Sequence, residues 1–482
     1  MHGRGARRQV NFGGMAALIV CTALSLLSLV SAAPAPGLGL AKGVGGTLDQ
    51  SFGRHGRAIL RVTWPQGYER QQDFAMAAYP GSKIVVGNSD AVFEFGSDGQ
   101  LDPGFGDGGR LTLPLGPTFA LSAIVVDSQG RILVGGTVLT VGGIDDEAGG
   151  LFTPRSVWIA RLLPEGQLDS SFGEGGVLRT KLGRPVPPSL DERSARTPSP
   201  YEYSEPSVSL FGLAIDGRGR LVLNGSTVIE HVEVDRTGMY SEELFDIRKA
   251  YVARLSSSGE LDTSFGQNGV VETEGSEVAS SPLPIGGGRI EYTTGIHSPP
   301  RGSIRSAELH AVDGSGSELA SLRKWPHQSV SWELTDIVGD RQGRSLLLGF
   351  RDIEYETNGP TFVARLLSSG MPDHSFGRAG RRPVPRTADT YFVGLGVDRG
   401  GRPLIVGERG KTFWLTRMTA DGHRDRSFGR SGIVETRFGS AWAHPRAVVT
   451  DSRGRIVVGC TIVNPANPGS FGFALARYRS GR

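Results

Sequence analysis

Six aspartates occupy the same position in a repeated stretch, and their type and spacing raise the question of a metal site. Carboxylates are preferred ligands of Ca²⁺, but such a site needs about six to eight oxygens. Each copy supplies one carboxylate, with no second acidic residue at a fixed offset. We therefore predict that each aspartate caps a turn and that no metal is bound. The six are Asp49, Asp102, Asp169, Asp262, Asp373 and Asp425.

A phenylalanine follows each of these aspartates by three residues. One interpretation is a ladder of exposed rings that binds a ligand, and the other is a set of wedges between neighbouring structural units. Burying a phenylalanine contributes about 1.5–3 kcal/mol, so we predict the second role. The residues are Phe52, Phe105, Phe172, Phe265, Phe376 and Phe428.

Two sets of arginines recur as well. The first set alternates with apolar residues in an apolar-Ala-Arg-Leu motif, where it makes structural hydrogen bonds to neighbouring units or, alternatively, forms a basic ring facing a ligand. The second set ends the motif Asp-x-x-Gly-Arg and is predicted to be solvated. The first set is Arg161, Arg254, Arg365, Arg417 and Arg477. The second is Arg131, Arg220, Arg344, Arg402 and Arg455.

Catalytic motifs are not found in the sequence. The histidines are scattered without metal-ligand spacing, and there is no nucleophile elbow, phosphate-binding loop or dinucleotide fingerprint. The acidic run 145–147 is interpreted as a solvated loop tip. We therefore assign no catalytic residue, no cofactor-binding residue and no metal ligand. Cys460, in an apolar run, is expected to be a buried, inert thiol.

These residues belong to one repeating module. Its opening stretch, of the form Gly-x-x-Asp-x-x-Phe-Gly-x-x-Gly, occurs at 46–56, 99–109, 166–176, 259–269, 370–380 and 422–432. An apolar strand, an Asp-x-x-Gly-Arg turn and a second apolar strand predict a β-hairpin. The arginine motif supplies a third strand, and the apolar residues after the opening stretch supply a fourth. Each module is therefore predicted to be a four-stranded antiparallel sheet.

The spacing of the modules predicts their number. Successive aspartates are 53, 67, 93, 111 and 52 residues apart, and 111 is about twice the base period. A degenerate module fits there, with Gly287–Arg289 as its hairpin turn and Leu309–Glu318 as its third strand and turn. The chain starts with a fourth-strand motif and ends with a third-strand motif. We predict a single all-β domain over 46–482, a seven-bladed β-propeller closed by pairing of the N-terminal strand with the C-terminal blade. Six blades, with 280–330 as an insertion, and an open solenoid are the alternatives.

Surplus residues map to three insertions. Those near 140–156 and 229–249 lengthen hairpins between second and third strands, and the one near 184–206 joins two modules. Insertions gathered on one rim are expected to form a binding surface.

Residues 1–33 have the form of a secretory signal peptide: a basic start, an apolar run and small residues for cleavage. An uncleaved anchor is the alternative, and Arg7-Arg8 is a weak hint of twin-arginine export. Residues 34–45 form a Pro/Gly-rich lead. Cleavage would remove three of the 52 basic residues and none of the 49 acidic ones, leaving no formal charge. We therefore expect no nucleic-acid binding, no membrane span after cleavage, a location that is secreted, periplasmic or at the cell surface, and a monomer.

The stretches Leu168–Gly176 and Leu261–Gly269 resemble the delta-60 repeat family of exported bacterial proteins, whose repeat reads Leu-Asp-x-Ser-Phe-Gly-x-x-Gly. The copy at 101 departs from it with Pro103-Gly104, and the copies at 373 and 425 lack the leucine. The resemblance covers 46–482. It implies a β-propeller-like fold and no established activity.

Export, repeats along the whole chain, neutral charge and missing catalytic motifs favour a non-catalytic scaffold that binds an extracytoplasmic protein or glycan. The alternative is an extracytoplasmic hydrolase or lyase with a site at the central channel. That enzyme would require unlike polar residues to converge on the innermost strands, near 72–78, 119–126, 209–215, 332–338, 390–397 and 444–450. These segments read as mostly apolar.

Overall fold

The structure is a computed structural model. It describes residues 45–63, 73–113, 119–141, 152–180, 182, 201–203, 207–234, 240–274, 277–278, 280–297, 304–319, 332–351, 360–384, 390–464 and 467–481. The expected signal peptide at 1–33, nearly all of the lead at 34–45 and most of the insertions near 140–156 and 184–206 lie outside these residues. The described part of the chain contains no helix of the length and hydrophobicity that a bilayer crossing requires.

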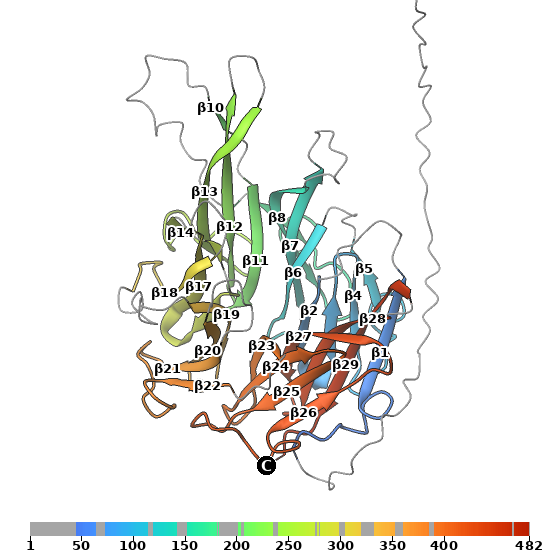
Figure 1. The fold of residues 1–482 in the computed structure, drawn as a ribbon. Coiled ribbons are helices and arrows are strands. Elements are labelled where there is room, and N and C mark those ends of the chain that lie inside the picture. The colour runs from blue at the N-terminus through green and yellow to red at the C-terminus, as the bar shows by residue number, and fades with distance from the viewer. Residues whose placement is uncertain are drawn as a thin grey trace, which may run out of the picture.

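Seven antiparallel sheets, here called blades 1 to 7, follow one another along the chain (Figure 1). Blade 1 contains β2 (Ala75–Ala78), β3 (Ile84–Gly87), β4 (Ala91–Phe95) and β5 (Arg110–Thr112). Blade 2 contains β6 (Phe119–Val126), β7 (Ile132–Val141), β8 (Phe152–Leu162) and β9 (Val177–Thr180). Blade 3 contains β10 (Tyr201–Tyr203), β11 (Ser207–Ile215), β12 (Leu221–Val234), β13 (Tyr240–Leu255) and β14 (Val270–Glu274). Blade 4 contains β15 (Glu277–Val278), β16 (Leu283–Ile285), β17 (Arg289–His297) and β18 (Ile304–Val312).

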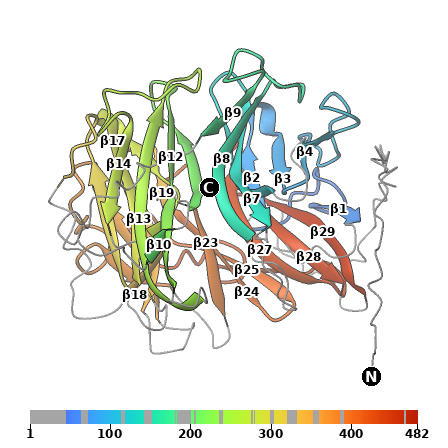
Figure 2. The same cartoon turned by 90° about the horizontal axis from the view of Figure 1, so that it is seen from above.

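The remaining three blades complete the ring seen in Figure 2. Blade 5 contains β19 (Trp332–Gly339), β20 (Ser345–Arg351), β21 (Thr361–Leu366) and β22 (Arg381–Pro383). Blade 6 contains β23 (Tyr391–Val397), β24 (Pro403–Arg409), β25 (Thr412–Arg417) and β26 (Ile433–Thr436). Blade 7 contains β27 (Trp442–Thr450), β28 (Ile456–Asn464), β29 (Asn467–Tyr478) and, from the other end of the chain, β1 (Arg57–Thr63).

The ring is closed by its two ends. Strand β1 pairs with β29 from Arg57 opposite Ala476 to Thr63 opposite Ser470, and Leu48 forms a bridge with Tyr478. The innermost strands β2, β6, β11, β16, β19, β23 and β27 each contact the next one, and β27 contacts β2. This confirms the seven-bladed propeller with its N-terminal closing strand, and the six-bladed ring and the open solenoid are wrong.

Blade 4 is the degenerate module. Its first strand is broken into β15 and β16, which pair with successive parts of β17. Strand β18 then pairs with β17, as the motif at Leu309–Glu318 predicts. Residues 320–331, between β18 and β19, lie outside the described residues.

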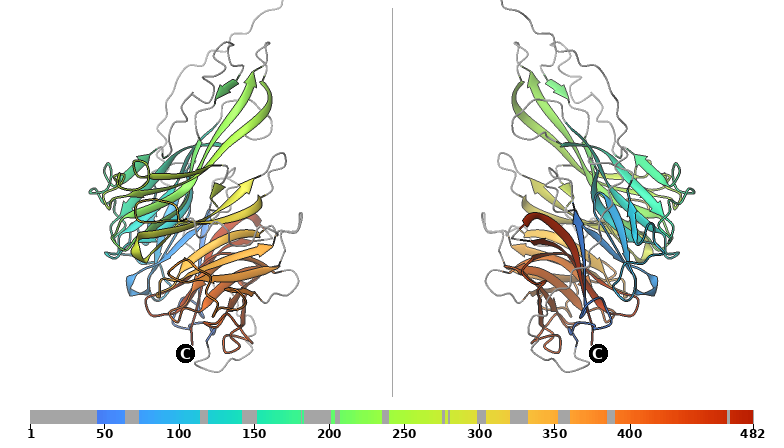
Figure 3. Two further views of the ribbon diagram at one scale, coloured as in Figure 1. Left: turned by 90° about the vertical axis from the view of Figure 1, so that its left-hand side faces the viewer. Right: turned by 90° about the vertical axis from the view of Figure 1, so that its right-hand side faces the viewer.

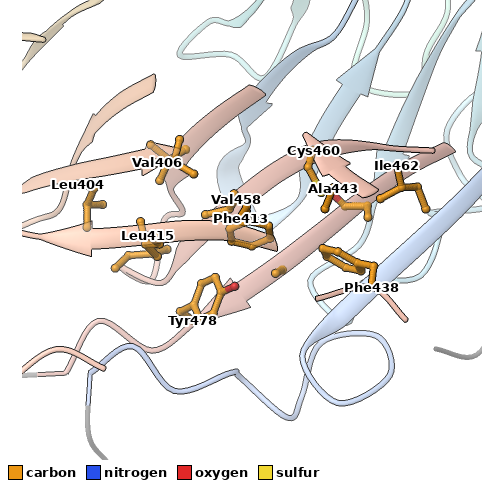
Figure 4. Close-up of a cluster of buried hydrophobic side chains, with 14 of the residues drawn as sticks. Leu404, Val406, Phe413, Leu415, Phe438, Ala443, Val458, Cys460, Ile462 and Tyr478 are labelled. Atoms are coloured by element: carbon orange, nitrogen blue, oxygen red, sulfur yellow. The ribbon is translucent and has the colours of Figure 1, made fainter. Parts of the chain in front are cut away.

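The hydrophobic core is divided among the seven interfaces between blades. Figure 4 shows the interface of blades 6 and 7, where Leu404 and Phe413 of one blade face Val458 and Tyr478 of the other. Blade packing thus depends on contacts repeated around the ring. Of the described residues, the smallest cluster lies between blades 3 and 4 and comprises Val222, Val252, Phe265, Ile290, Tyr292 and Val312.

A β-bulge interrupts the innermost strand in five blades. A bulge leaves ladder groups of its strand without their usual partner, and side chains of the preceding blade bond some of the nearby amides. The N–H of Leu210 donates to Thr137 Oγ1 (2.9 Å), and the N–H of Leu395 donates to Asp336 Oδ2 (2.8 Å). Neighbouring blades are therefore joined near the ring axis as well as by their hydrophobic faces.

One hairpin extends far beyond the ring. Strands β12 and β13 stay paired out to Val234 opposite Tyr240, and β10 adds to the same extension by pairing with β12. Figures 1 and 3 show this hairpin rising past the ends of the other blades. Residues 229–234 and 240–249 of the expected insertion are thus continuous with the two strands.

Candidate functional site

Five blades share a polar cluster, here called the clamp, that joins the third strand to the turn before the fourth. In blade 2, Arg161 donates from Nε to Asp169 Oδ2 (2.8 Å) and from Nη2 to Ser171 Oγ (2.9 Å). Asp169 Oδ1 accepts bonds from the N–H and the hydroxyl of Ser171 (3.1 and 2.7 Å). The aspartate thus caps its turn and holds the arginine. The other clamps pair Arg254 with Asp262, Arg365 with Asp373, Arg417 with Asp425 and Arg477 with Asp49.

Each clamp also reaches the following blade. In blade 7, Arg477 Nη1 donates to the carbonyl of Ser97 in blade 1 (2.6 Å), and its guanidinium lies 4.3 Å from the centre of the Phe52 ring. The turn of blade 1 packs closely on this ring. A Cβ added to Gly99 of that turn would come 2.8 Å from Phe52. The six phenylalanines are all 0% exposed, which places them between blades and not on a ligand-facing surface.

The aspartates of the clamps are held as carboxylates. Hydrogen bonding from the Ser264 hydroxyl, supported by Arg254, lowers the pKa of Asp262 to about 2 even though burial opposes the shift. Burial is the largest influence on the pKa of Asp49, and it acts upward, but the bonds from Ser51 and the charge of Arg477 leave that pKa below its ordinary value. The carboxylate oxygens of both residues are therefore engaged by the protein. Among the described residues, no group of three or more His, Cys, Asp or Glu is arranged to hold a metal ion.

The prediction that the Asp-x-x-Gly-Arg arginines are solvated is wrong. Arg131 folds back on the first residue of its own turn, with Nε 2.6 Å from Asp127 Oδ2, and its side chain is only 23% exposed. Its Nη1 also lies 3.7 Å from Asp169 of the clamp. Each such arginine therefore adds a second cation to a clamp carboxylate. The same arrangement is found for Arg220, Arg344, Arg402 and Arg455.

Blade 1 departs from this arrangement. Glu94, which is 0% exposed, stands where the clamp arginine would be, and Tyr79 replaces the aspartate of the hairpin turn. Lys83 supplies the cation, with Nζ 2.7 Å from Glu94 Oε1 and 2.8 Å from Asp102 Oδ2. Burial raises the pKa of Glu94, against the effect of Lys83.

Blade 4 departs in a related way. Ala311 takes the place of the clamp arginine, since Val312 bridges Glu318 as Leu162 bridges Leu168 in blade 2. Arg289, at the end of the hairpin turn, donates to the carbonyl of Ser368 in blade 5 (2.5 Å). The buried Glu291 accepts a bond from the Ser345 hydroxyl of blade 5 and lies 2.7 Å from Arg289 Nη2. Burial raises the pKa of Glu291 as well. In both blades a second-strand cation and a buried glutamate replace the usual pair.

The innermost strands, whose sequences read as mostly apolar, carry polar side chains at their bulges. Asp336 on β19 remains partly accessible, yet protein surrounds its carboxylate and raises its pKa to about 6. Burial is the cause of the raised pKa, and the backbone N–H groups of Leu395 and Ile337, which bond the carboxylate, act against it. Arg446, at the bulge of β27, is partly buried and has a lowered pKa for the same reason, burial. The apolar interpretation missed these residues because a bulge turns single positions away from the alternating faces.

A second group, here called the rim cluster, consists of Tyr391, Trp442 and His444 on the innermost strands and Glu408 on the neighbouring strand β24. His444 Nδ1 lies 2.9 Å from Glu408 Oε2, which links blade 7 to blade 6. The Trp442 and His444 rings lie 6.4 Å apart, and Tyr391 is the register partner of Glu408. The sequence signal for this group is the pair of ring-bearing residues two positions apart at the start of a predicted innermost strand.

Cys460 has no reactive character. It is 0% exposed, its Sγ lies 3.3 Å from the carbonyl of Ala474, and burial raises its pKa well above the ordinary value. It is a packing residue in the core between blades 6 and 7.

No family model matches the chain, and no curated protein matches it either. Similar solved structures include an ulvan lyase of a new polysaccharide lyase family, PL25, with 10% identity and a TM-score of 0.39, covering 92% of this chain and 94% of that one. A gluconolactonase from Xanthomonas campestris has 12% identity and a TM-score of 0.34, covering 94% and 99%. A protein of unknown function from Dyadobacter fermentans has 12% identity and a TM-score of 0.37, covering 74% and 95%. Similarities at this level carry no argument about function.

Proposed function

We propose that this chain is an exported propeller of the delta-60 repeat type that binds a protein or glycan outside the cytoplasm without catalysing a reaction. The observation that carries the proposal is the hairpin β12–β13, which extends a paired backbone surface beyond the ring. The clamp arginines and aspartates support it, since they are engaged in joining blades and leave the loops and rims as the surface for recognition. The proposal includes cleavage of 1–33 and a monomeric mature chain.

The test is a pair of shortened proteins, one with the tip between 229 and 249 replaced by a two-residue turn and one with 140–156 shortened likewise. Binding partners would be captured from cell-surface extracts, identified, and then titrated in purified form. We expect shortening of the first tip to weaken binding while the melting temperature stays within a few degrees. Full binding by both shortened proteins would contradict the proposal.

An enzyme is the second candidate, and the polar side chains on and beside the innermost strands favour it. Glu408 and His444 form a hydrogen-bonded pair, and Asp336 has a pKa of about 6, within the range useful for proton transfer near neutral pH. A screen of esters and glycosides with the purified protein tests this candidate. Turnover that is lost in Asp336→Asn or His444→Ala would establish it over the scaffold.

A further inference from the structure

Exposed aromatic rings gather on one kind of strand. Among the described residues, the aromatic side chains with the largest exposure are Phe211 (44%), Trp442 (42%) and Tyr391 (40%), and all three lie on innermost strands. A single exposed ring is common on a protein surface, whereas neighbouring exposed rings bordered by polar groups mark a ligand or partner site. Tyr391 and Trp442 belong to neighbouring blades, whereas Phe211 lies on β11 in blade 3.

Tyr391 and Trp442 start their strands at the same face of the ring. Each is the first residue of its innermost strand, and the strands β23 and β27 are in contact. Tyr391 pairs with Glu408 near the end of the second strand of its blade. Because every blade repeats this strand order around the ring, the second strand β12 also runs toward this face. The projecting hairpin and the rim cluster therefore share one face.

Hydrogen-bonding groups lie between the two rings. The Glu408–His444 pair bridges the blades, with side chains 32% and 31% exposed. Its bond uses Nδ1 of the imidazole and Oε2 of the carboxylate, so Nε2 and Oε1 are the remaining polar atoms of the pair. The rim cluster thus offers two aromatic surfaces, one carboxylate acceptor and one imidazole nitrogen within a single contiguous group.

We infer that the rim cluster binds the sugar rings of a glycan. A pyranose presents an apolar C–H face that packs on an aromatic ring, bordered by hydroxyls that both donate and accept hydrogen bonds. Trp442 and Tyr391 provide the packing surfaces. Glu408 accepts hydrogen bonds from sugar hydroxyls, and the imidazole of His444 forms a further hydrogen bond with a hydroxyl. This inference rests on the proposed function and names its ligand as a glycan. A protein partner is less well matched, because stable protein interfaces need about 800 Å² on each side, far more than four partly exposed side chains offer.

The experiment is an oligosaccharide array of neutral and uronic-acid-containing glycans probed with the purified protein, followed by calorimetric titration of the strongest oligosaccharide. We expect Trp442→Ala and Tyr391→Ala each to weaken binding about tenfold or more, as loss of one stacked ring predicts. Trp442→Phe should keep most of the affinity, because the aromatic face remains. Glu408→Gln should also weaken binding, since it disrupts the bridge to His444.

Phe211→Ala is the matched control, an exposed aromatic on an innermost strand outside the rim cluster, and it should bind like the unchanged protein. Equal affinity of Trp442→Ala and the unchanged protein, with melting temperatures unchanged, would overturn the inference. So would the absence of any glycan on the array that binds. If a purified protein partner binds through the 229–249 hairpin and the array shows no glycan, the inference fails while the proposed scaffold function stands.

Discussion

The five blades with a regular clamp and the two divergent blades both pair their buried charged groups, but with different residues. In a regular blade, two arginines and two aspartates alternate, and a serine hydroxyl holds the central carboxylate. In blades 1 and 4, one cation from the second strand binds a buried glutamate instead. The central carboxylate has a lowered pKa in the regular blades, and the buried glutamate has a raised pKa in the divergent ones.

The comparison shows which features of the module are kept in every blade and which vary. The cation at the end of the hairpin turn is present in all seven blades, as Lys83 in blade 1 and Arg289 in blade 4. The backbone of the turn is kept as well, since the residue before that cation has a positive φ even where it is Ser82 (66°). The third-strand arginine, by contrast, is exchanged for Glu94 in blade 1 and for Ala311 in blade 4. A buried charge needs a partner, but the partner can come from a different strand.

The largest effect is expected from breaking a regular clamp at the closure. Arg477→Ala leaves Asp49 buried with one fewer cation, removes the bond to Ser97, and should lower the free energy of unfolding by about 3–5 kcal/mol. Chemical denaturation measures this loss. Arg61→Ala, at an exposed arginine of β1, is the control and should change stability by no more than about 0.5 kcal/mol. A loss for Arg477→Ala as small as that of the control would show that the clamps do not hold the ring.

An intermediate effect is expected from converting blade 1 to the regular arrangement. Glu94→Arg alone places two cations beside Asp102 with no second carboxylate, and should destabilise the protein by about 3 kcal/mol. The combined change Tyr79→Asp, Lys83→Arg, Glu94→Arg and Gly104→Ser rebuilds every charged group of a clamp and should recover most of that loss. Thermal and denaturant unfolding of the two proteins tests the comparison. If the combined change is no better than Glu94→Arg, the clamp is not an interchangeable unit.

The smallest effect is expected from removing the serine of one clamp. Ser264→Ala deletes the hydroxyl that contributes most to lowering the pKa of Asp262, so this pKa should rise from about 2 toward 3.8. The stability that comes from the lowered pKa is present above about pH 3.8 and is lost as the pH falls toward 2. The variant should therefore be about 1 kcal/mol less stable at neutral pH and show a weaker pH dependence in that window. Carboxyl NMR titration gives the pKa, with the exposed Ser258→Ala as control. An unchanged pKa would contradict the assigned role of Ser264.

Most of the fold could be predicted because the module repeats its turn residues. The spacing of Asp and Phe residues predicts the number of blades, and the half-modules at the two ends predict the closure that β1 and β29 form. The broken first strand of blade 4 could not be predicted, since β15 and β16 carry none of the repeated residues. The exposure of Arg131 was predicted wrongly because its pairing with Asp127 depends on the folded-back turn and not on the strand pattern.

The candidate site was predicted much less well than the fold. Repetition draws attention to residues such as Asp169 and Phe172, whose equivalents occur in many blades and join them. The rim cluster uses residues that differ from blade to blade, and Glu408 and His444 meet only because blade 6 packs against blade 7. Sequence periodicity describes what the blades have in common. A site built from what differs between two of them requires the ring in three dimensions.

The closing strand β1 also has a consequence for the order of folding. Among the described strands of the ring, β1 is synthesised first and its partner β29 last. Contacts this distant in sequence form slowly. Until β29 is available, the backbone groups of β1 are unpaired and can pair with strands of other chains. Arg57 and Arg61, four residues apart on the same face of a mostly apolar strand, give β1 a repulsive charge during that interval. Closure of the ring therefore has to follow the synthesis of β29, and a chain that lacks β29 would leave β1 without its partner.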